Sequence, residues 1–214
     1  MAEDVLNKPW RPMASGRLTP DQAVRLLYFM HPLCFLVGMY VGGFVPYAVL
    51  TFFHVWYNEF GAASNGILKN IFNGVGIGCF FAGPLEVATR HSVFSGNAEG
   101  AIWVGLLMAA FGTTSHVQDF RDMEGDRAGG RSTIPLMMDE MAARVLAVAG
   151  VGCWTELTCR FWRAGWLQRS APWVTGALLI ANLMLDRTNA GDVRAWQLWS
   201  VWVLALMLLP IFAA

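Results

Sequence analysis

Charged side chains are scarce in this sequence. Asp, Glu, Lys and Arg make up 14% of its 214 residues, whereas a typical soluble domain has about 25%. Neither sign is in excess, because 15 basic residues balance 15 acidic ones. The chain therefore lacks the basic surplus of a nucleic-acid-binding protein and the acidic surplus of a solvated tail. Instead it is 56% hydrophobic, with 14 Phe, 11 Met and 10 Trp, and this composition excludes intrinsic disorder.

Cysteine is also rare, and none of it is arranged for a zinc site. No CxxC pair occurs, and every cysteine lies in an apolar run, so we interpret all of them as small hydrophobic residues. They are Cys34, Cys79, Cys153 and Cys159. The first residues lack a basic segment followed by an apolar one, so no cleavable signal peptide is expected.

Long apolar segments dominate the rest of the chain. They occupy residues 24–41, 44–57, 67–88, 101–114, 142–159, 172–185 and 193–213. Most approach or exceed the ~17 residues that a helix needs to cross a bilayer. The sequence therefore predicts an all-α fold, a multi-pass transmembrane bundle of about seven helices in one domain over residues 1–214. Three segments are short for a full span, so composition alone leaves a soluble helical bundle as the alternative.

The distribution of basic residues favours the membrane. If the N-terminus is cytoplasmic and each apolar segment crosses, ten basic residues fall at or near cytoplasmic ends and four fall outside, a positive-inside bias. The ten are Lys8, Arg11, Arg17, Arg25, Arg121, Arg127, Arg131, Arg144, Arg187 and Arg194, and the four are Arg90, Arg160, Arg163 and Arg169. This topology places the N-terminal stretch and the segment after Thr114 on the same side.

Two glycines, Gly74 and Gly78, form a small-xxx-small pair within an apolar segment. A dinucleotide-binding fingerprint would require a strand before the glycines, and no strand is expected here. The pair therefore predicts close packing between two helices.

An acidic cluster follows the fourth apolar segment. Asp119, Asp122 and Asp126, with Glu124 between them, lie within eight residues. If the helix continues through this stretch, the three aspartates share one face. Their mutual repulsion is relieved by a divalent cation, and carboxylate oxygens suit Mg²⁺, which also accepts phosphate oxygens. The cluster predicts a site for Mg²⁺ and a diphosphate.

Three arginines, Arg121, Arg127 and Arg131, alternate with these acids and can bind phosphate oxygens. The alternative is a loop held together by salt bridges alone. The ordered spacing of the aspartates, followed by Gly130 and Pro135, favours the metal site.

Two stretches carry a resemblance to a known family. Residues 116–126, HVQDFRDMEGD, continuing to Pro135, resemble the second aspartate-rich motif of the UbiA superfamily of membrane prenyltransferases. Residues 4–12, DVLNKPWRP, with Gly16 and Arg17, resemble the closing half of the first motif. The two motifs occur in the family's order, and the likeness extends over nearly the whole chain.

The resemblance implies a set of site residues. Asp119, Asp122 and Asp126 are the expected catalytic and Mg²⁺-binding residues, with Asp4 as a further metal ligand on an opposing loop. The expected substrate-binding residues are Asn7, Lys8, Arg11, Lys69, Arg121, Arg127 and Arg131. For Asn7, Lys8 and Arg11 the alternative is a basic segment flanking the membrane, and for Lys69 it is a lysine that snorkels to the interface.

Five further residues are weaker candidates. Tyr57 and Asn58 lie near a cytoplasmic helix boundary, and His116 directly precedes the acidic run, where a hydrogen-bonded structural histidine is the alternative. Glu86 and Glu156 lie in or near apolar segments, where a carboxylate is a functional hypothesis by default.

The first motif of the family reads NxxxDxxxD, and Asp4 matches only its last aspartate. The family also has two helices before the first predicted here. We therefore expect an N-terminally truncated sequence, and a shortened protein that has lost part of one metal site is the alternative.

The resemblance implies a Mg²⁺-dependent enzyme that ionises an allylic prenyl diphosphate of the farnesyl or geranyl class and transfers the prenyl group to an acceptor, such as an aromatic compound. A terpene cyclase of the same family is the first alternative. An inactive truncated protein is the second, and a small-solute transporter is a weaker third. The likeness to fungal members implies an internal membrane such as the endoplasmic reticulum.

Overall fold

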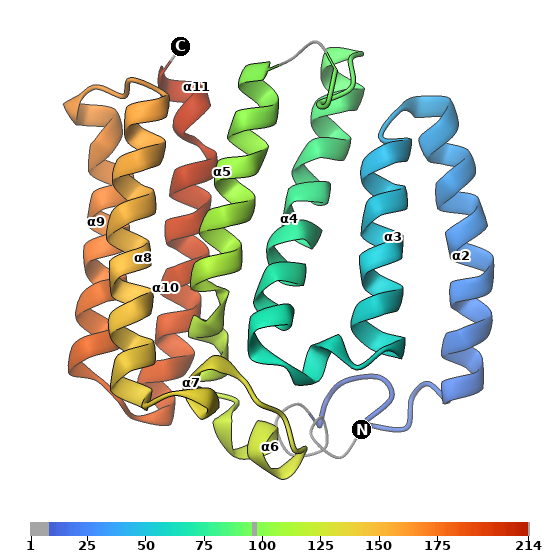
Figure 1. Ribbon diagram of the computed structural model, residues 1–214, viewed down its shortest axis with the longest axis horizontal. Helices are drawn as coiled ribbons and strands as arrows, with labels where there is room; N and C mark the ends of the chain where they lie inside the picture. Colours follow the sequence, from blue (N-terminus) through green and yellow to red (C-terminus); the bar gives the residue numbers. More distant parts are fainter. Residues whose placement is uncertain (1–8, 96–97, 214) are drawn as a thin grey trace.

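A computed structural model describes residues 9–95 and 98–213. The elements that it assigns in these ranges are helices, accompanied by a single isolated bridge between Asn65 and Ser132. The long helices stand side by side in an antiparallel bundle (Figure 1). They are α2 (Pro20–Val41), α3 (Phe44–Glu59), α4 (Gly66–Thr89), α5 (Ala98–Thr114), α8 (Glu140–Phe161), α9 (Trp166–Leu185) and α10 (Asn189–Met207).

Each predicted apolar segment coincides with one of these long helices, which confirms the helical bundle. Short helices connect or extend them: η1 (Ala62–Ser64), η2 (Ser115–Asp119), α6 (Met123–Ala128), α7 (Ile134–Met137) and α11 (Leu209–Ala213). Four helical stretches are long and apolar enough to cross a membrane, namely Pro20–Val41, Gly66–Thr89, Ala98–Asp119 and Asn189–Ile211. Much of their apolar surface faces outward, and α2 contains no buried residue at all.

Capping residues fix where the helices begin. Thr19 accepts a hydrogen bond from the backbone of Gln22, whose side chain in turn accepts one from the backbone of Thr19. This capping box, with Pro20 at the first helical position, starts α2 four residues before the apolar run. In the same way Asp139 and Thr188 cap α8 and α10.

Helices α4 and α5 approach each other closely at the two glycines. A Cβ atom on Gly74 would lie 2.6 Å from the backbone oxygen of Met108, and one on Gly78 would lie 2.1 Å from the Met108 side chain. A side chain at position 74 would therefore require α5 to shift, and one at position 78 would require the Met108 side chain to move. The predicted use of the pair in helix packing is confirmed.

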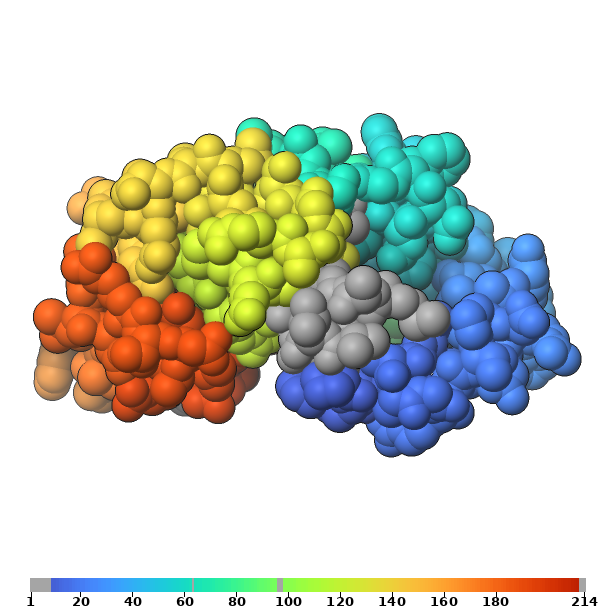
Figure 2. Space-filling view, turned by 90° about the horizontal axis from the view of Figure 1, so that it is seen from below, coloured from blue at the N-terminus to red at the C-terminus, as the bar shows by residue number. Residues whose placement is uncertain are grey.

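The two ends of the bundle differ. Residues 9–19, η1, η2, α6, α7 and the turn between α9 and α10 gather at one end, which we call the loop end (Figure 1). Seen from that side, residues 115–140 fill the middle of the face, between residues 9–19 and the start of α10 (Figure 2). The predicted proximity of the N-terminal stretch and the segment after Thr114 is thus confirmed.

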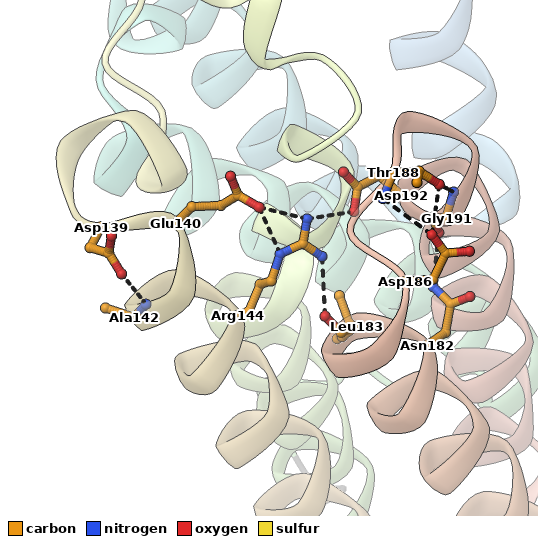
Figure 3. Close-up of polar contacts among 10 residues, drawn as sticks. All are labelled: Asp139, Glu140, Ala142, Arg144, Asn182, Leu183, Asp186, Thr188, Gly191 and Asp192. Atoms are coloured by element: carbon orange, nitrogen blue, oxygen red, sulfur yellow. Dashed lines mark hydrogen bonds and ion pairs between the residues drawn. The ribbon is translucent and has the colours of Figure 1, made fainter.

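A buried arginine ties the helices together at the loop end. Figure 3 shows the Arg144 guanidinium between two carboxylates, 2.9 Å from Glu140 and 2.8 Å from Asp192. Nη1 also donates to the carbonyl oxygen of Leu183, at 3.2 Å. The guanidinium carbon lies 4.3 Å from the centre of the Phe120 ring. One side chain thereby joins α8, α9, α10 and the segment between η2 and α6.

Candidate active site at the loop end

The acidic segment does not form one continuous helix. A 3₁₀ turn, η2, ends at Asp119, and Asp122 is the N-cap of the short helix α6, which contains Asp126. The three aspartates were expected to share one helical face if the helix continued through this stretch. The helix does not continue, because the chain turns at 120–122, so the aspartates do not share one regular helical face. The three side chains nevertheless lie close enough for their charges to interact.

All three aspartates are buried, which is unusual for carboxylates. Asp119 and Asp126 are fully inaccessible, and Asp122 is 8% exposed. One carboxylate oxygen of Asp119 and one of Asp126, Oδ2 in each case, has no hydrogen-bond partner. Burial raises the pKa of Asp126, and the neighbouring Asp119 and Asp122 raise it further, against the opposing effect of Lys69 and Arg131.

Lys69 reaches this cluster from α4. Asn65 caps the helix by accepting from the backbone N–H groups of Ile67 and Leu68, and this places Lys69 in the first turn. The Lys69 ammonium lies 2.5 Å from Oδ1 of Asp119, and both side chains are buried. This ion pair favours the substrate-site prediction for Lys69 over a lysine that snorkels to the interface.

Backbone contacts fasten the segment after α6 to the start of α4. The N–H of Gly66 donates to the carbonyl of Ser132 at 2.6 Å, and the N–H of Ser132 donates to the carbonyl of Ser64 at 2.8 Å. A Cβ on Gly66 would lie 2.7 Å from backbone atoms of Ser132 and Ile134. The absence of a side chain at Gly66 therefore lets the loop approach α4.

The predicted arginines occupy different positions. Arg131 lies 3.5 Å from Oδ1 of Asp126. Arg121 lies 3.7 Å from Oδ1 of Asp122, and its guanidinium stands 5.2 Å from the centre of the Trp196 ring. Arg127 is exposed and lines a separate surface hollow with Arg131. Arg11 lies exposed at the loop end, whereas Asp4, Asn7 and Lys8 lie outside the described residues.

Among residues 9–95 and 98–213, no group of three or more His, Cys, Asp and Glu side chains is arranged to hold a metal ion. At Asp119, the lysine ammonium provides the compensating positive charge instead.

An apolar cavity of about 350 Å³ opens beside the aspartates. Ser115 and Gln118 of η2 form part of its lining, directly before Asp119. Its other walls come from α3, α4, α5 and α10. The remaining lining residues are Leu50, Phe53, His54, Tyr57, Phe72, Asn73, Gly76, Ile77, Phe80, Phe111, Trp196 and Trp199.

Aromatic rings make up much of this wall. Trp196 and Trp199 stack with ring centres 4.8 Å apart, and Phe111 stands edge-on to Trp199 at 5.0 Å. Phe53 and Phe72 form a second edge-on pair at 5.0 Å. Such faces stabilise a nearby cation by about 0.5–2 kcal/mol each. Sequence reasoning missed these residues, and the spacing of Trp196 and Trp199 on one helical face is the signal that was available.

The remaining candidates have structural partners. His116 is within 3.1 Å of the carbonyl oxygen of Ala143, which favours the structural alternative. Glu86 accepts from Ser92 and from the backbone of Val93 at the other end of the bundle. Glu156 pairs with Arg160 at 2.6 Å. Tyr57 lines the cavity, and the Asn58 amide donates to the backbone oxygen of His54.

Comparison with known proteins agrees with this architecture. The family model described as the UbiA prenyltransferase family matches residues 1–202. A fumagillin beta-trans-bergamotene synthase from Aspergillus fumigatus is 29% identical over 98% of this chain and 72% of its own length. A somaliensene A/B synthase from Streptomyces somaliensis is 30% identical over 94% of this chain and 68% of its own length.

Transferases of related chemistry match a shorter part of the chain. A digeranylgeranylglyceryl phosphate synthase from Methanobrevibacter smithii is 28% identical over 68% of this chain and 53% of its own length. A solved structure of a digeranylgeranylglyceryl phosphate synthase superposes with a TM-score of 0.64 at 16% identity, over 98% of this chain and 76% of that one. That likeness confirms the fold.

Proposed function

The chain belongs to the UbiA prenyltransferase family, and on this premise we propose that it ionises an allylic prenyl diphosphate with Mg²⁺ and directs the resulting cation to a cyclic terpene. It is an integral membrane protein, because that family is one of membrane enzymes and four of its helical stretches have the length and hydropathy of membrane spans. We place it in an internal membrane such as the endoplasmic reticulum.

The observation that carries the proposal is the position of the buried aspartates next to an aromatic cavity, whose lining includes Ser115 and Gln118 directly before Asp119. A prenyl diphosphate has a strongly anionic head and an apolar tail. The head fits the end where Asp119, Lys69 and Arg121 lie, and the tail fits the cavity. Each CH₂ buried there contributes about 0.8 kcal/mol.

The aspartates have the chemistry of a Mg²⁺ site. Hard carboxylate oxygens are preferred by this ion, and the unpartnered Oδ2 atoms of Asp119 and Asp126 are such oxygens in a buried setting. The three aspartates do not form a complete ligand set on their own, so Asp119, Asp122 and Asp126 would hold the metal together with phosphate oxygens of the substrate, and the metal would neutralise charge on the leaving diphosphate. Asp4 remains a further proposed ligand.

The chain's own cations complete the neutralisation. Lys69 and Arg131 flank the aspartates, and both can donate to phosphate oxygens. Arg121 lies between this cluster and Trp196, at the boundary of the cavity. The apolar walls exclude water from the allylic cation, and the aromatic faces stabilise its charge.

Cyclisation is favoured over transfer by the relatives that match nearly the whole chain, since they are named as a beta-trans-bergamotene synthase and a somaliensene A/B synthase. Transfer to an acceptor, such as an aromatic compound, is the second candidate. It is favoured by the polar side chains in the cavity wall, Asn73, Ser115 and Gln118, which can hydrogen-bond an acceptor hydroxyl.

The test is incubation of the purified, reconstituted chain with Mg²⁺ and geranyl or farnesyl diphosphate, with and without a phenolic acceptor. Released diphosphate and organic products are both measured. Hydrocarbon formed without acceptor supports cyclisation, and acceptor-dependent product supports transfer. EDTA is expected to abolish both, and Mg²⁺ to restore them. A chain that releases no diphosphate from either substrate contradicts the proposal.

A matched pair of variants tests the site. Asp122→Asn removes a metal-binding charge and is expected to lower turnover by about 100-fold or more, as loss of one electrostatic partner does elsewhere. Glu124→Gln changes an exposed carboxylate of the same segment and is expected to retain activity. Equal activity of the two variants contradicts the assignment.

A further inference from the structure

One titratable side chain of the cavity wall has no part in the chemistry described so far. Leu50, Phe53, His54 and Tyr57 follow the helical spacing along one face of α3, and all four line the cavity. Among the lining residues that the structure describes, there is no Asp, Glu, Lys or Arg. The imidazole of His54 is therefore the side chain of this lining that has the chemistry of a proton acceptor.

His54 also lies at a depth that suits the prenyl chain rather than the diphosphate. It precedes Glu59, the last residue of α3 at the loop end, by five positions, which is about 7.5 Å along the helix axis. Lys69 occupies the first turn of α4 at that same end. The imidazole thus stands beside the apolar cavity, inward of the charged cluster.

Polar groups of α2 and of α3 itself lie near the exposed His54 ring. The ring centre of His31 lies 6.3 Å from that of His54, and Nδ1 of His31 is 2.8 Å from the hydroxyl of Tyr47. The Asn58 amide donates to the backbone oxygen of His54 at 2.8 Å, and its contacts with the ring nitrogens are longer, 3.3 and 3.4 Å. These groups provide a polar environment for an imidazolium within an apolar segment.

The proposed reaction requires a proton acceptor. Heterolysis of the carbon–oxygen bond leaves the electron pair on the diphosphate and an allylic cation on the prenyl chain. The final carbocation becomes neutral when an adjacent C–H bond breaks, its electrons form a C=C bond, and the proton leaves. After transfer to an aromatic ring, the same kind of loss restores the ring.

We propose that His54 is the base that receives this proton. This inference rests on the ionisation chemistry proposed above. The C–H electrons remain with the product, and the proton moves to an imidazole nitrogen of His54. The diphosphate oxygens would compete poorly for this proton, because Lys69 and Arg131 would hold them at the loop end, whereas His54 lies more than one helical turn inward of that end.

The test compares His54→Phe with wild type in reconstituted membranes that contain Mg²⁺ and farnesyl diphosphate. Diphosphate release measures ionisation of the substrate, and product analysis shows whether the carbocation loses a proton to form an olefin or is captured by water. His54→Phe is expected to retain most diphosphate release, while the ratio of the wild-type olefin to released diphosphate falls by about tenfold or more. Water-captured alcohols or other isomers replace it. If His54→Phe does not fold, His54→Gln removes the base with a polar side chain of similar reach.

His91→Phe is the matched control. His91 lies at the far end of α4, outside the cavity lining, and its substitution is expected to leave the product ratio unchanged. A wild-type product ratio in both His54 variants overturns the inference, as does a parallel fall of release and product with an unchanged ratio. A wild-type chain that releases no diphosphate overturns the proposed function together with the inference.

Discussion

At the scale of single residues, the ion pair between Lys69 and Asp119 has a large energetic consequence. The two groups are 2.5 Å apart and both are buried. A buried charge that loses its partner is strongly destabilising, because no water compensates it. The site therefore depends on the lysine for its stability.

Lys69→Met is expected to lower the free energy of unfolding in Mg²⁺-free detergent by about 3–5 kcal/mol. Adding Asp119→Leu should recover much of this loss, since the unpaired carboxylate is then absent. Thermal unfolding followed by tryptophan fluorescence measures both. An equal loss of unfolding free energy in the single and the double variant would show that the unpaired Asp119 carboxylate is not the cause of the destabilisation.

The sequence predicted the aspartates and Lys69 as members of one site, but it could not predict how they meet. Lys69 and Asp119 are 50 positions apart, and only the packing of α4 against η2 brings them together. His54 gave no signal, because a lone histidine in an apolar run resembles any core histidine. Its role depends on which face of α3 borders the cavity.

At the scale of elements, the helices were predictable and their ends were less so. Apolar runs located every long helix, but α9 begins at Trp166, six residues before Pro172, where the predicted segment starts. Pro172 lies inside α9, where it removes one intrahelical hydrogen bond, so the apolar run did not reveal that the helix starts before it. The turn that interrupts the acidic segment at 120–122 was also not predictable. At this turn Phe120 packs against Arg144, a contact that the local sequence does not reveal.

The contact between α4 and α5 makes a direct prediction. Gly74→Val places a Cβ 2.6 Å from the backbone oxygen of Met108, so α5 must move, and a loss of at least about 1–3 kcal/mol is expected. Gly83→Ala is the control, since nothing lies within 4 Å of its Cβ. Alanine there is expected to raise helix stability by about 0.5–1 kcal/mol. Unfolding midpoints that fall equally in both variants would contradict the close contact.

The junction at Arg144 makes a second prediction at this scale. Arg144→Met leaves Asp192 buried without its cation and is expected to cost about 3–5 kcal/mol of unfolding free energy. The double variant with Asp192→Leu should lose much less. Arg194→Gln is the control, because Arg194 pairs with Asp186 at the surface and such pairs contribute little. Thermal unfolding of wild type, the two single variants and the double variant measures these losses. Equal unfolding midpoints for Arg144→Met and Arg194→Gln would contradict the prediction.

At the scale of the whole molecule, the two ends carry the charge asymmetry that the sequence predicted. Arg121, Arg127 and Arg144 lie at the loop end, and Arg90 and Arg163 lie at the other. Because successive antiparallel helices place their connecting loops at alternating ends of the bundle, the apolar runs were sufficient to predict which loops lie at the same end. The cavity was not readable in this way, because its walls combine the consecutive helices α3, α4 and α5 and the turn η2 with α10, which is distant in the chain.

The asymmetry predicts that the loop end faces the cytoplasm. Arg127→Cys and Arg163→Cys each introduce a thiol at one end, while the native cysteines lie within helices. A membrane-impermeant maleimide added to sealed vesicles with the cytoplasmic face outward is expected to label Arg127→Cys alone. Labelling of Arg163→Cys alone would reverse the orientation.

The cavity wall reaches the outer surface of the bundle. Phe80 lines the cavity and is 63% exposed, so the chamber communicates sideways with the surrounding acyl chains. Substrate and olefin can exchange with the bilayer without crossing bulk water. The quantity that governs saturation is then the mole fraction of prenyl diphosphate in the lipid, and dilution of the bilayer with inert phospholipid slows turnover at constant molarity.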